Sequence, residues 1–255
     1  MMAKDKFHLK TLVIVQARMG SMRLPGKSMK EILGRPLLSF LIERLQRCAH
    51  HDRIIVATTN QPLDKQIVEF CRREHIHCYI GDENDVLDRY FQASLSEGAD
   101  IVVRVTGDCP LIDPTIVDEV IRFFVDHYPK YDYVSNVIDR TYPRGMDVEV
   151  FSAKCLEAIK RYAVTPDEKE HVTAYVLNHR DRFSTYSIRS KKDLSDFRLT
   201  VDTEEDFLLI KTIIEELYPT NSLFAMKDIL KVFRTHPEWK ALNAHIRQKE
   251  GVSRK

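Results

Sequence analysis

The chain has 255 residues, of which 44% are hydrophobic and 30% are charged. This length and balance fit one large globular domain, or one domain with a short appendage. The formal net charge of +1 argues against nucleic acid as a partner, and the apolar runs are too short to span a membrane. The five cysteines form no C-x-x-C pair, and the amino terminus lacks the apolar core of a signal peptide. We therefore expect a cytoplasmic protein that binds neither nucleic acid nor membrane.

Short β-branched runs alternate with helical runs along the first half of the chain. We expect strands at residues 12–16, 54–58, 77–80 and 101–105. We expect helices that begin at Pro36 and Pro62 and helices over 85–95 and 114–125. This order is typical of a mostly parallel sheet covered on both faces, whose ligands bind at the carboxyl ends of the strands.

The second half of the chain has a different pattern. We expect strands at residues 133–137, 147–151, 183–188 and 198–201. The helical periodicity predicts helices over 154–162, 170–178 and 204–217. Pro219 ends the last of these helices, and residues 223–255 resemble a helical appendage with a basic, solvated tail.

A cationic loop, A-R-M-G-S-M-R-L-P-G-K, occupies residues 17–27, directly after the first expected strand. Glycines let the backbone approach a ligand, and exposed N–H groups cradle phosphate oxygens. Arg18, Arg23 and Lys27 add positive charge there. The loop is not G-x-G-x-x-G, and five residues between Gly20 and Gly26 are one too many for a Walker A loop. Composition alone leaves a basic surface loop as an equal alternative.

The stretch Q-A-R-M-G-S-M-R-L-P-G-K resembles the signature of the cytidylyltransferase family of spore-coat polysaccharide biosynthesis. That family is related to the CMP-Kdo and CMP-sialic acid synthetases, and its loop wraps the triphosphate of CTP. The resemblance implies that Arg18 and Lys27 contact phosphates and serve catalysis, and that Arg23 shapes the loop or touches phosphate. It also implies a nucleotide-lining role for Gln16, Ala17, Gly20 and Ser21.

Asp108 follows the expected strand 101–105, where a metal ligand would face the phosphates. Mg²⁺ takes one or two protein carboxylates, with water and phosphate completing its octahedron. From position alone, a turn aspartate is an equal alternative. The segment G-D-C-P-L-I, however, resembles the family's G-D-x-P-L-I stretch, whose aspartate binds Mg²⁺. The resemblance therefore implies that Asp108 is a catalytic residue and a Mg²⁺ ligand.

A second carboxylate comes from V-D-T-E-E-D, residues 201–206. Asp202 or Thr203 could simply cap the helix that follows. The stretch resembles the family's V-D-T-x-E-D segment, whose first aspartate is the other Mg²⁺ ligand. We therefore expect Asp202 to bind Mg²⁺ and Thr203 to cap the helix, and we assign Asp206 a structural role.

Other candidates are weighed against ordinary structural roles. Relatives carry an Asp-Arg pair near the nucleotide, which favours Arg89 over an exposed helix arginine. Thr58 and Asn60 follow the second strand and contact base or ribose, unless they form a polar turn. Residues at the loop 142–147 and at 170–171 resemble the spore-coat branch, where a sugar acid needs a cation for its carboxylate and polar groups for its hydroxyls. Our expected sugar-binding set is Arg144, Asp147, Glu149 and His171, with a polar strand face and a surface histidine as the alternatives.

Two apparent sites receive an ordinary interpretation. His75, His77 and Cys78 have no fourth ligand nearby, so we expect no metal there. Cys109 has no base paired with it in the sequence and is expected to be a buried small side chain. Thr106 stands where CMP-Kdo synthetases commonly have Gln, which leaves its contacts open.

The resemblance, over residues 11–217, implies a Rossmann-like nucleotide-diphospho-sugar transferase fold. That fold has three α/β/α layers around a mostly parallel mixed sheet. We expect a nucleotidyltransferase domain over residues 1–218 and a C-terminal helical extension over 219–255. Within the domain, residues 11–130 would bind the nucleotide, and 131–218 would bind the sugar and offer a surface for homodimer formation.

The implied reaction is the Mg²⁺-dependent transfer of CMP from CTP to a sugar acid, with release of pyrophosphate, for surface polysaccharide synthesis. Two alternatives remain open. A glycosyltransferase of the related fold would consume a nucleotide sugar, although such enzymes usually carry an Asp-x-Asp motif that this chain lacks after its central strand. A non-catalytic nucleotide-sensing subunit would bind CTP without turnover.

Overall fold

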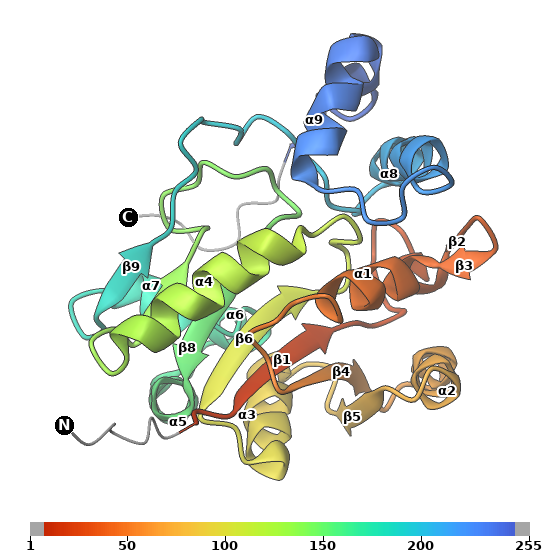
Figure 1. Cartoon of the computed structure of the whole chain (residues 1–255). Helices are drawn as coiled ribbons and strands as arrows, with labels where there is room; N and C mark the ends of the chain where they lie inside the picture. The colour runs from red at the N-terminus through yellow and green to blue at the C-terminus, as the bar shows by residue number, and fades with distance from the viewer. Residues whose placement is uncertain (1–7, 248–255) are drawn as a thin grey trace.

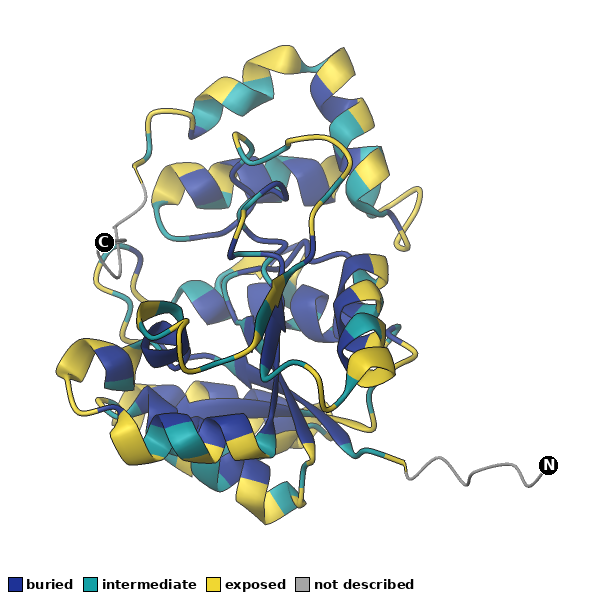
Figure 2. Cartoon of the chain, turned by 90° about the vertical axis from the view of Figure 1, so that its left-hand side faces the viewer, coloured by how far each residue is buried: buried dark blue, intermediate teal, exposed yellow. Residues whose placement is uncertain are grey.

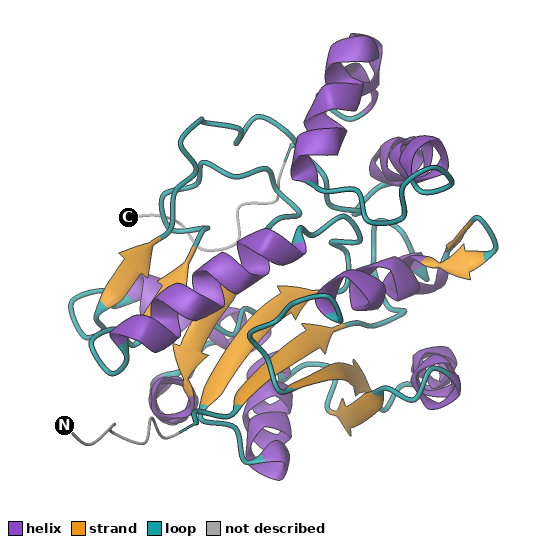
Figure 3. Ribbon diagram, in the orientation of Figure 1, coloured by secondary structure: helices purple, strands orange, loops and turns teal. Residues whose placement is uncertain are grey.

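One seven-stranded sheet forms the centre of the computed structural model, which describes residues 8–247. Its strands lie in the order β5-β4-β1-β6-β8-β7-β9 (Figure 3). They are β1 (Thr11–Gln16), β4 (Arg53–Thr59), β5 (His77–Gly81), β6 (Ile101–Thr106), β7 (Tyr133–Ser135), β8 (Glu149–Ser152) and β9 (Thr185–Ser187). β8 is antiparallel to β6 and β7, whereas the other pairs in this sheet are parallel. The expected mostly parallel mixed sheet is confirmed.

Helices cover both faces of the sheet (Figure 1), because successive side chains of a strand point to opposite sides. Val13 and Val15 pack in one apolar cluster with α1 (Leu37–Leu45), α2 (Lys65–Arg73), α4 (Pro114–His127), α8 (Glu204–Leu217) and α9 (Met226–Thr235). Leu12 and Ile14 pack in the other with α3 (Val86–Glu97), α5 (Ala153–Tyr162) and α7 (Ala174–Asn178). Figure 2 shows the buried strands enclosed between helices whose outer faces are exposed. This is the expected three-layer α/β/α architecture.

The two halves of the chain share this sheet. Strand β8 from the second half pairs with β6 from the first, with Arg104 opposite Glu149. Residues on either side of position 130 therefore belong to one continuous core. Short elements complete the chain: η1 (Lys27–Met29), β2 (Glu31–Ile32), β3 (Arg35–Pro36), η2 (Pro62–Asp64), α6 (Pro166–Glu170) and η3 (Pro237–Leu242).

Several expected elements differ from those observed. Pro36 is the residue before α1 and belongs to the short hairpin β2–β3. The helix expected over 170–178 is confined to α7 at 174–178, because Glu170 ends the separate helix α6 and residues 171–173 are not helical. Residues 198–201 form no strand but a single bridge between Arg198 and Arg144. At Pro36 the local hairpin competes with the helix, whereas at Arg198 the bridge to Arg144 is a contact with a distant segment.

Residues 219–247 of the C-terminal extension fold back on the domain. Ile229 and Phe233 of α9 are buried in the larger apolar cluster, and η3 packs against α8 and α9. Residues 248–255, where the basic tail was expected, lie outside the described residues. No helix within residues 8–247 is long and apolar enough to cross a membrane.

Candidate active site

The carboxyl ends of β1 and β6 meet at one edge of the sheet. Gln16 and Thr106 are opposite each other in the parallel pairing, and the Gly107 N–H donates to the Gln16 carbonyl at 2.8 Å. A Cβ on residue 107 would lie only 2.8 Å from that same carbonyl oxygen. Residue 107 must therefore be glycine for the chain after β6 to pass this close to the end of β1. The next residue, Asp108, then lies at the carboxyl ends of the two strands.

A cavity of about 590 Å³ opens at this edge. Both halves of the chain contribute to its walls. Most of the residues expected to bind nucleotide, metal or sugar line it: Gln16, Ala17, Arg18, Ser21, Arg23, Lys27, Arg89, Asp108, Arg144, Asp147, His171 and Asp202.

The cationic loop after β1 is curled around the backbone of Met19. The N–H groups of Ser21 and Gly26 both donate to the Met19 carbonyl at 2.9 Å. The Met19 N–H in turn donates to Asp64 at 2.6 Å, and the buried carboxylate of Asp64 also accepts from the Thr59 hydroxyl. Asp64 thus anchors the loop from below. Asp64 is not among the residues expected at the site, because its partners Met19 and Thr59 are brought to it only by the fold.

Lys27 lies between the two aspartates that were expected to bind Mg²⁺. Its Nζ is 2.8 Å from Asp108 Oδ2, 2.8 Å from Asp202 Oδ1 and 2.7 Å from the Val201 carbonyl. Burial disfavours the charged ammonium, but the two carboxylates outweigh it and hold the pKa of Lys27 above its ordinary value. Burial likewise disfavours the charged form of Asp108, and Lys27 nevertheless lowers the pKa of that carboxyl. Lys27 and Asp108 are therefore both charged at neutral pH.

The segment that carries Asp202 is fastened to the backbone of Asp108. The Asp108 carbonyl accepts from the Val201 N–H at 2.8 Å and from the Thr200 hydroxyl at 3.1 Å. This contact brings together two aspartates that are far apart in the sequence. The Thr106 hydroxyl donates to Asp108 Oδ1 at 2.6 Å, so Thr106 orients this carboxylate.

Arg198 is a further participant that the sequence reasoning missed. Its guanidinium donates to Asp202 at 2.9 Å and to both oxygens of Asp206 at 2.8 Å. Thr203 and Asp206 form a capping box at the start of α8, as expected from their positions. Arg198 therefore joins the start of α8 to Asp202. A strand was expected over residues 198–201, and strand periodicity does not predict that the Arg198 side chain points toward Asp202 and Asp206.

The paired aspartates fit a divalent cation. Each presents a carboxylate oxygen within 2.8 Å of one ammonium, so one ion placed between them can reach both. No group of three or more His, Cys, Asp or Glu side chains suited to a metal occurs within residues 8–247. A cation here would take its remaining ligands from water and substrate, which is the usual arrangement for Mg²⁺.

Three arginines, Arg18, Arg23 and Arg89, also line the cavity. Arg23 lies 2.9 Å from Asp202, and Arg18 lies 3.6 Å from Glu83 and 3.8 Å from Glu170. Arg89 is buried rather than exposed on its helix, and it donates to the Asp82 carbonyl at 2.9 Å.

Two buried polar atoms on the cavity lining, Arg89 Nε and Gln16 Oε1, have no hydrogen-bond partner among the described residues. Buried polar atoms of this kind are ordinarily satisfied by a ligand or water. The lining thus offers both a donor and an acceptor to a ligand.

The far wall of the cavity comes from the second half of the chain. Gly145 has φ +96°, and a Cβ there would lie 2.3 Å from the Leu199 carbonyl oxygen. This close approach places Arg144 against the segment that carries Asp202, where its backbone exchanges hydrogen bonds with Phe197 and Leu199. Arg140 holds the Asp147 carboxylate through two contacts, at 2.6 and 2.8 Å. His171 lies beside Asp167, with 3.6 Å between their nearest ring nitrogen and carboxylate oxygen.

Four expected site residues lie outside the lining. Gly20 sits in the loop without facing the cavity, and Asn60 is exposed at the end of β4. Thr58 is fully buried within β4, and its hydroxyl, like Gln16 Oε1 and Arg89 Nε, has no hydrogen-bond partner among the described residues. Glu149 was expected to bind sugar, but it lies beneath the sheet edge at 4% exposure. Its oxygens are engaged by Arg104, Tyr133 and Thr173, which makes it a buried structural carboxylate.

The cysteines match their ordinary interpretation. Cys109 is buried beside Asp108, and burial raises the pKa of its thiol well above the ordinary value. A neutral thiol of this kind is a poor nucleophile.

Comparison with known proteins identifies the family to which the chain belongs. A family model described as cytidylyltransferase matches residues 12–234, so the match extends beyond residue 217 into α9. An uncharacterized protein of Methanocaldococcus jannaschii is 34% identical over 94% of this chain and 97% of its own length. The spore coat polysaccharide biosynthesis protein SpsF of Bacillus subtilis is 32% identical, over 80% of this chain and 86% of its own.

Solved structures agree with the sequence matches. A cytidylyltransferase from Leptospira borgpetersenii superposes with a TM-score of 0.88 at 32% identity, over 95% of this chain and all of the other. A CMP-2-keto-3-deoxy-manno-octonic acid synthetase complexed with CTP has a TM-score of 0.62 at 19% identity, over 82% and 100% of the two chains, and supports the fold. On the match of the family model and of these relatives over most of their lengths, the chain belongs to the cytidylyltransferase family.

Proposed function

We propose that this protein transfers CMP from CTP to a hydroxyl of a sugar acid and releases pyrophosphate, in the synthesis of a surface polysaccharide. The observation that carries the proposal is the convergence of Lys27, Asp108 and Asp202 in one cavity at the carboxyl ends of β1 and β6. A triphosphate needs cations, and a metal bridging its oxygens needs carboxylates. The relatives that act in spore-coat polysaccharide synthesis and on 3-deoxy-manno-octulosonate suggest the acceptor class.

In the proposed reaction, the acceptor hydroxyl attacks the α-phosphorus of CTP. A new P–O bond forms, the bond to pyrophosphate breaks, and the hydroxyl proton passes to solvent water. Arg18, Arg23 and Lys27 offset the charge that develops on the departing pyrophosphate. Asp108 and Asp202 would hold Mg²⁺. When bound, Mg²⁺ supplies Lewis-acid neutralisation at the phosphate oxygens. Because little covalent work falls to the side chains, the site acts by positioning and charge.

The acceptor half of the proposed site uses residues from the second half of the chain. Arg144 supplies a cation for the acceptor carboxylate, and Asp147 and His171 supply polar contacts for its hydroxyls. Glu149 is left out of this set because its oxygens are already engaged. On the nucleotide side, the unpartnered Gln16 Oε1 and Arg89 Nε are available to the base and ribose.

The test is a release assay. Four nucleoside triphosphates are combined with a panel of sugar acids, and pyrophosphate is measured with and without Mg²⁺. We expect release with CTP, in the presence of Mg²⁺, and with a sugar acid. Consumption of a CMP-sugar or UDP-sugar without pyrophosphate would instead identify a glycosyltransferase. Binding of CTP without turnover on any acceptor would identify a nucleotide-sensing subunit.

Asp108→Ala provides the residue-level test. We expect it to abolish Mg²⁺-dependent pyrophosphate release while part of the CTP affinity, measured by calorimetry, survives. Asp126→Ala is the matched control, since Asp126 is an exposed aspartate of α4 outside the cavity lining. Full turnover by Asp108→Ala would remove this carboxylate from the mechanism.

We propose further that the protein works in the cytoplasm as a homodimer. All five cysteines are free thiols, which suits a reducing compartment. Sedimentation velocity tests the dimer: a single species at the monomer mass across micromolar concentrations would contradict it. Fractionation of the source cells tests the compartment.

A further inference from the structure

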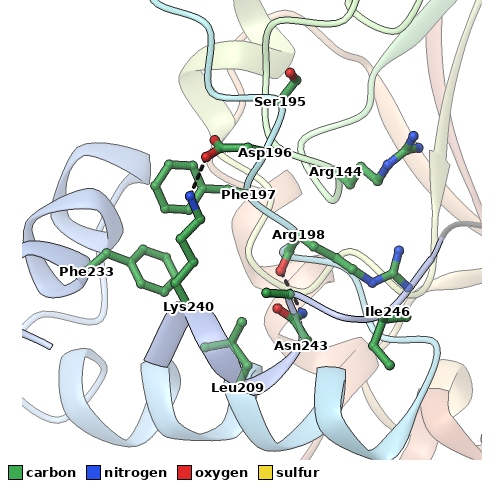
Figure 4. A pocket seen from close by; sticks show the side chains of 11 residues that line it. Arg144, Ser195, Asp196, Phe197, Arg198, Leu209, Phe233, Lys240, Asn243 and Ile246 are labelled. Carbon is green, nitrogen blue, oxygen red and sulfur yellow. Dashed lines mark hydrogen bonds and ion pairs between the residues drawn. The ribbon is translucent and has the colours of Figure 1, made fainter. Parts of the chain in front are cut away.

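Asn243 is a buried polar residue in the C-terminal extension, directly after η3. It is 3% exposed. Its amide Nδ2 donates to Asp206 Oδ1 at 2.8 Å and to the Arg198 carbonyl at 3.1 Å. Figure 4 shows the second contact, with the Asn243 side chain pointing toward Arg198. A buried amide needs such partners, and here both belong to the segment around the candidate active site.

The contacts continue from Asn243 to the carboxylate of Asp202. Asp206 is fully buried and accepts from Arg198 through both of its oxygens, at 2.8 Å each. The same Arg198 guanidinium donates to Asp202 Oδ2 at 2.9 Å. A hydrogen-bonded series therefore runs from the extension to a proposed metal ligand: Asn243, Asp206, Arg198 and Asp202.

Arg198 differs from the other cations that contact Asp202. Lys27 and Arg23 belong to the loop that is proposed to bind phosphate. A bound triphosphate competes with Asp202 for both of them. Arg198 lies outside that loop, and its guanidinium is held by both oxygens of Asp206 as well as by Asp202 Oδ2. Hydrogen bonds between charged groups are stronger and more directional than neutral ones, which makes Arg198 a suitable orienting group.

The elements η3 and α9 of the extension contact residues 196–197, directly before Arg198. Lys240 of η3 pairs with Asp196, and its ammonium lies 4.4 Å from the centre of the Phe197 ring. Phe197 also contacts Phe233 of α9, with ring centres 5.1 Å apart. These residues surround a second cavity of about 180 Å³, which is seen in Figure 4. These contacts hold η3 next to residues 196–198, so the position of Asn243 depends on the packing of α9 and η3.

We propose that the C-terminal extension is part of the metal site. Asn243 is a positioning residue: it fixes Asp206 and Arg198, and through them the direction in which Asp202 presents its carboxylate to a divalent cation. This inference rests on the proposed function, in which Asp108 and Asp202 hold Mg²⁺. Residues that orient metal ligands commonly change metal affinity 10- to 100-fold when they are removed.

Mn²⁺ binding to the full-length protein tests the inference. Free Mn²⁺ is measured by electron paramagnetic resonance in the presence of CTP and without acceptor, so that no turnover occurs. We expect Asn243→Ala to weaken Mn²⁺ affinity about 10-fold. CTP affinity in the absence of metal should stay within about 2-fold, because the nucleotide contacts are untouched. The matched control is Asn221→Ala, an exposed asparagine of the same extension, which should bind Mn²⁺ as the unchanged protein does.

A double-mutant cycle separates this role from a general loss of stability. If Asn243 acts through Asp202, then Asn243→Ala has no further effect on Mn²⁺ affinity once Asp202→Asn is in place. Additive losses would overturn the inference. If Asn243→Ala does not fold by circular dichroism, Asn243→Ser carries the same cycle, because it keeps one short donor and should lose about 3-fold.

The outcomes also separate the inference from the proposed function. Mn²⁺ binding that is indifferent to Asp202→Asn would refute the proposed metal site, and the inference with it. Mn²⁺ binding that depends on Asp202 but is unchanged by Asn243→Ala and Asn243→Ser would overturn the inference alone.

Discussion

At the scale of single residues, the site depends on which charges face one another. Lys27 is enclosed with Asp108 and Asp202, whereas its neighbour Lys30 pairs with Glu204, which is largely exposed. Both lysines follow the same loop, and both have a carboxylate 2.8 Å away. Surface ion pairs contribute little, whereas a buried cation between two carboxylates is strongly coupled to them. The two lysines should therefore respond very differently to substitution.

Lys27→Met should lower kcat/KM for pyrophosphate release about 100-fold, as is usual when a cation on the developing charge is lost. It should also lower the free energy of unfolding, since two carboxylates lose their shared partner. Lys30→Met is the control and should change kcat/KM less than about 3-fold. Steady-state kinetics and urea unfolding measure both effects; equal losses in the two variants would contradict the role of Lys27.

Glu149 gives a second prediction at this scale. Burial disfavours its charge, but Arg104, Thr173 and Tyr133 together hold the pKa of Glu149 below its ordinary value. A carboxyl with a lowered pKa stabilises the fold above its unfolded-state pKa, and this stability is lost as the pH falls through the lower folded-state value. Glu149→Gln should therefore cost about 3 kcal/mol at pH 7, and less as the pH falls below about 4.

Urea unfolding from pH 3 to pH 7 measures this difference. A cost that is constant with pH would show that the Glu149 charge is not the cause. A raised KM for the sugar acid with unchanged stability would restore the sugar-binding role first expected for Glu149.

At the scale of elements, tight backbone contacts bring the two halves of the site together. The turn at Gly145 lies against Leu199, which places Arg144 next to the Asp202 segment. Gly34 shares the left-handed conformation, with φ +70°, but a Cβ there meets nothing within 4 Å. Substituting Gly34 and Gly145 in turn therefore separates the free-energy cost of the backbone conformation from the cost of the steric contact.

Gly34→Ala should lower the free energy of unfolding by about 1 kcal/mol through backbone strain alone. Gly145→Ala should cost at least about 3 kcal/mol, because the added carbon also displaces the Leu199 carbonyl. It should weaken acceptor binding as well, through Arg144. Urea unfolding and acceptor KM report the two effects, and equal costs in both variants would show that the contact at Leu199 is unimportant.

At the scale of the whole molecule, three segments from distant parts of the sequence form one site. They are residues 17–27, 106–110 and 198–204, held together by hydrogen bonds between Asp108, Val201 and Lys27. A ligand that bridges them stabilises the entire fold by linkage, about 2.7 kcal/mol at 100 times its Kd. CTP with Mg²⁺ should therefore protect all three segments from hydrogen exchange together. In the Asp202→Asn variant, residues 198–204 should lose this protection while residues 17–27 keep it. If the ligand protects only residues 17–27 in the unchanged protein, the shared site is contradicted.

The sequence predicted much of the fold, because alternating apolar patterns are local and the strands and long helices follow them. It also predicted the loop 17–27, Asp108 and Asp202, since their residue types mark the ends of strands and the start of α8. These features depend on near neighbours in the chain. The resemblance to cytidylyltransferases then gave the pattern its chemical meaning.

Other features were decided only by the tertiary structure. Thr58 and Glu149 are polar residues of strands at positions where site residues were expected, yet neighbouring elements bury both side chains. No local pattern marks the roles of Arg198, Asp64 and Asn243. The partners of Asp64 and Asn243 are remote in the sequence, and Arg198 reaches Asp202 through a turn that periodicity does not predict. Periodicity specifies which face of an element is apolar. The packing of the elements decides which charged side chains face each other, and it places Lys27 Nζ 2.8 Å from a carboxylate oxygen of Asp108 and 2.8 Å from one of Asp202.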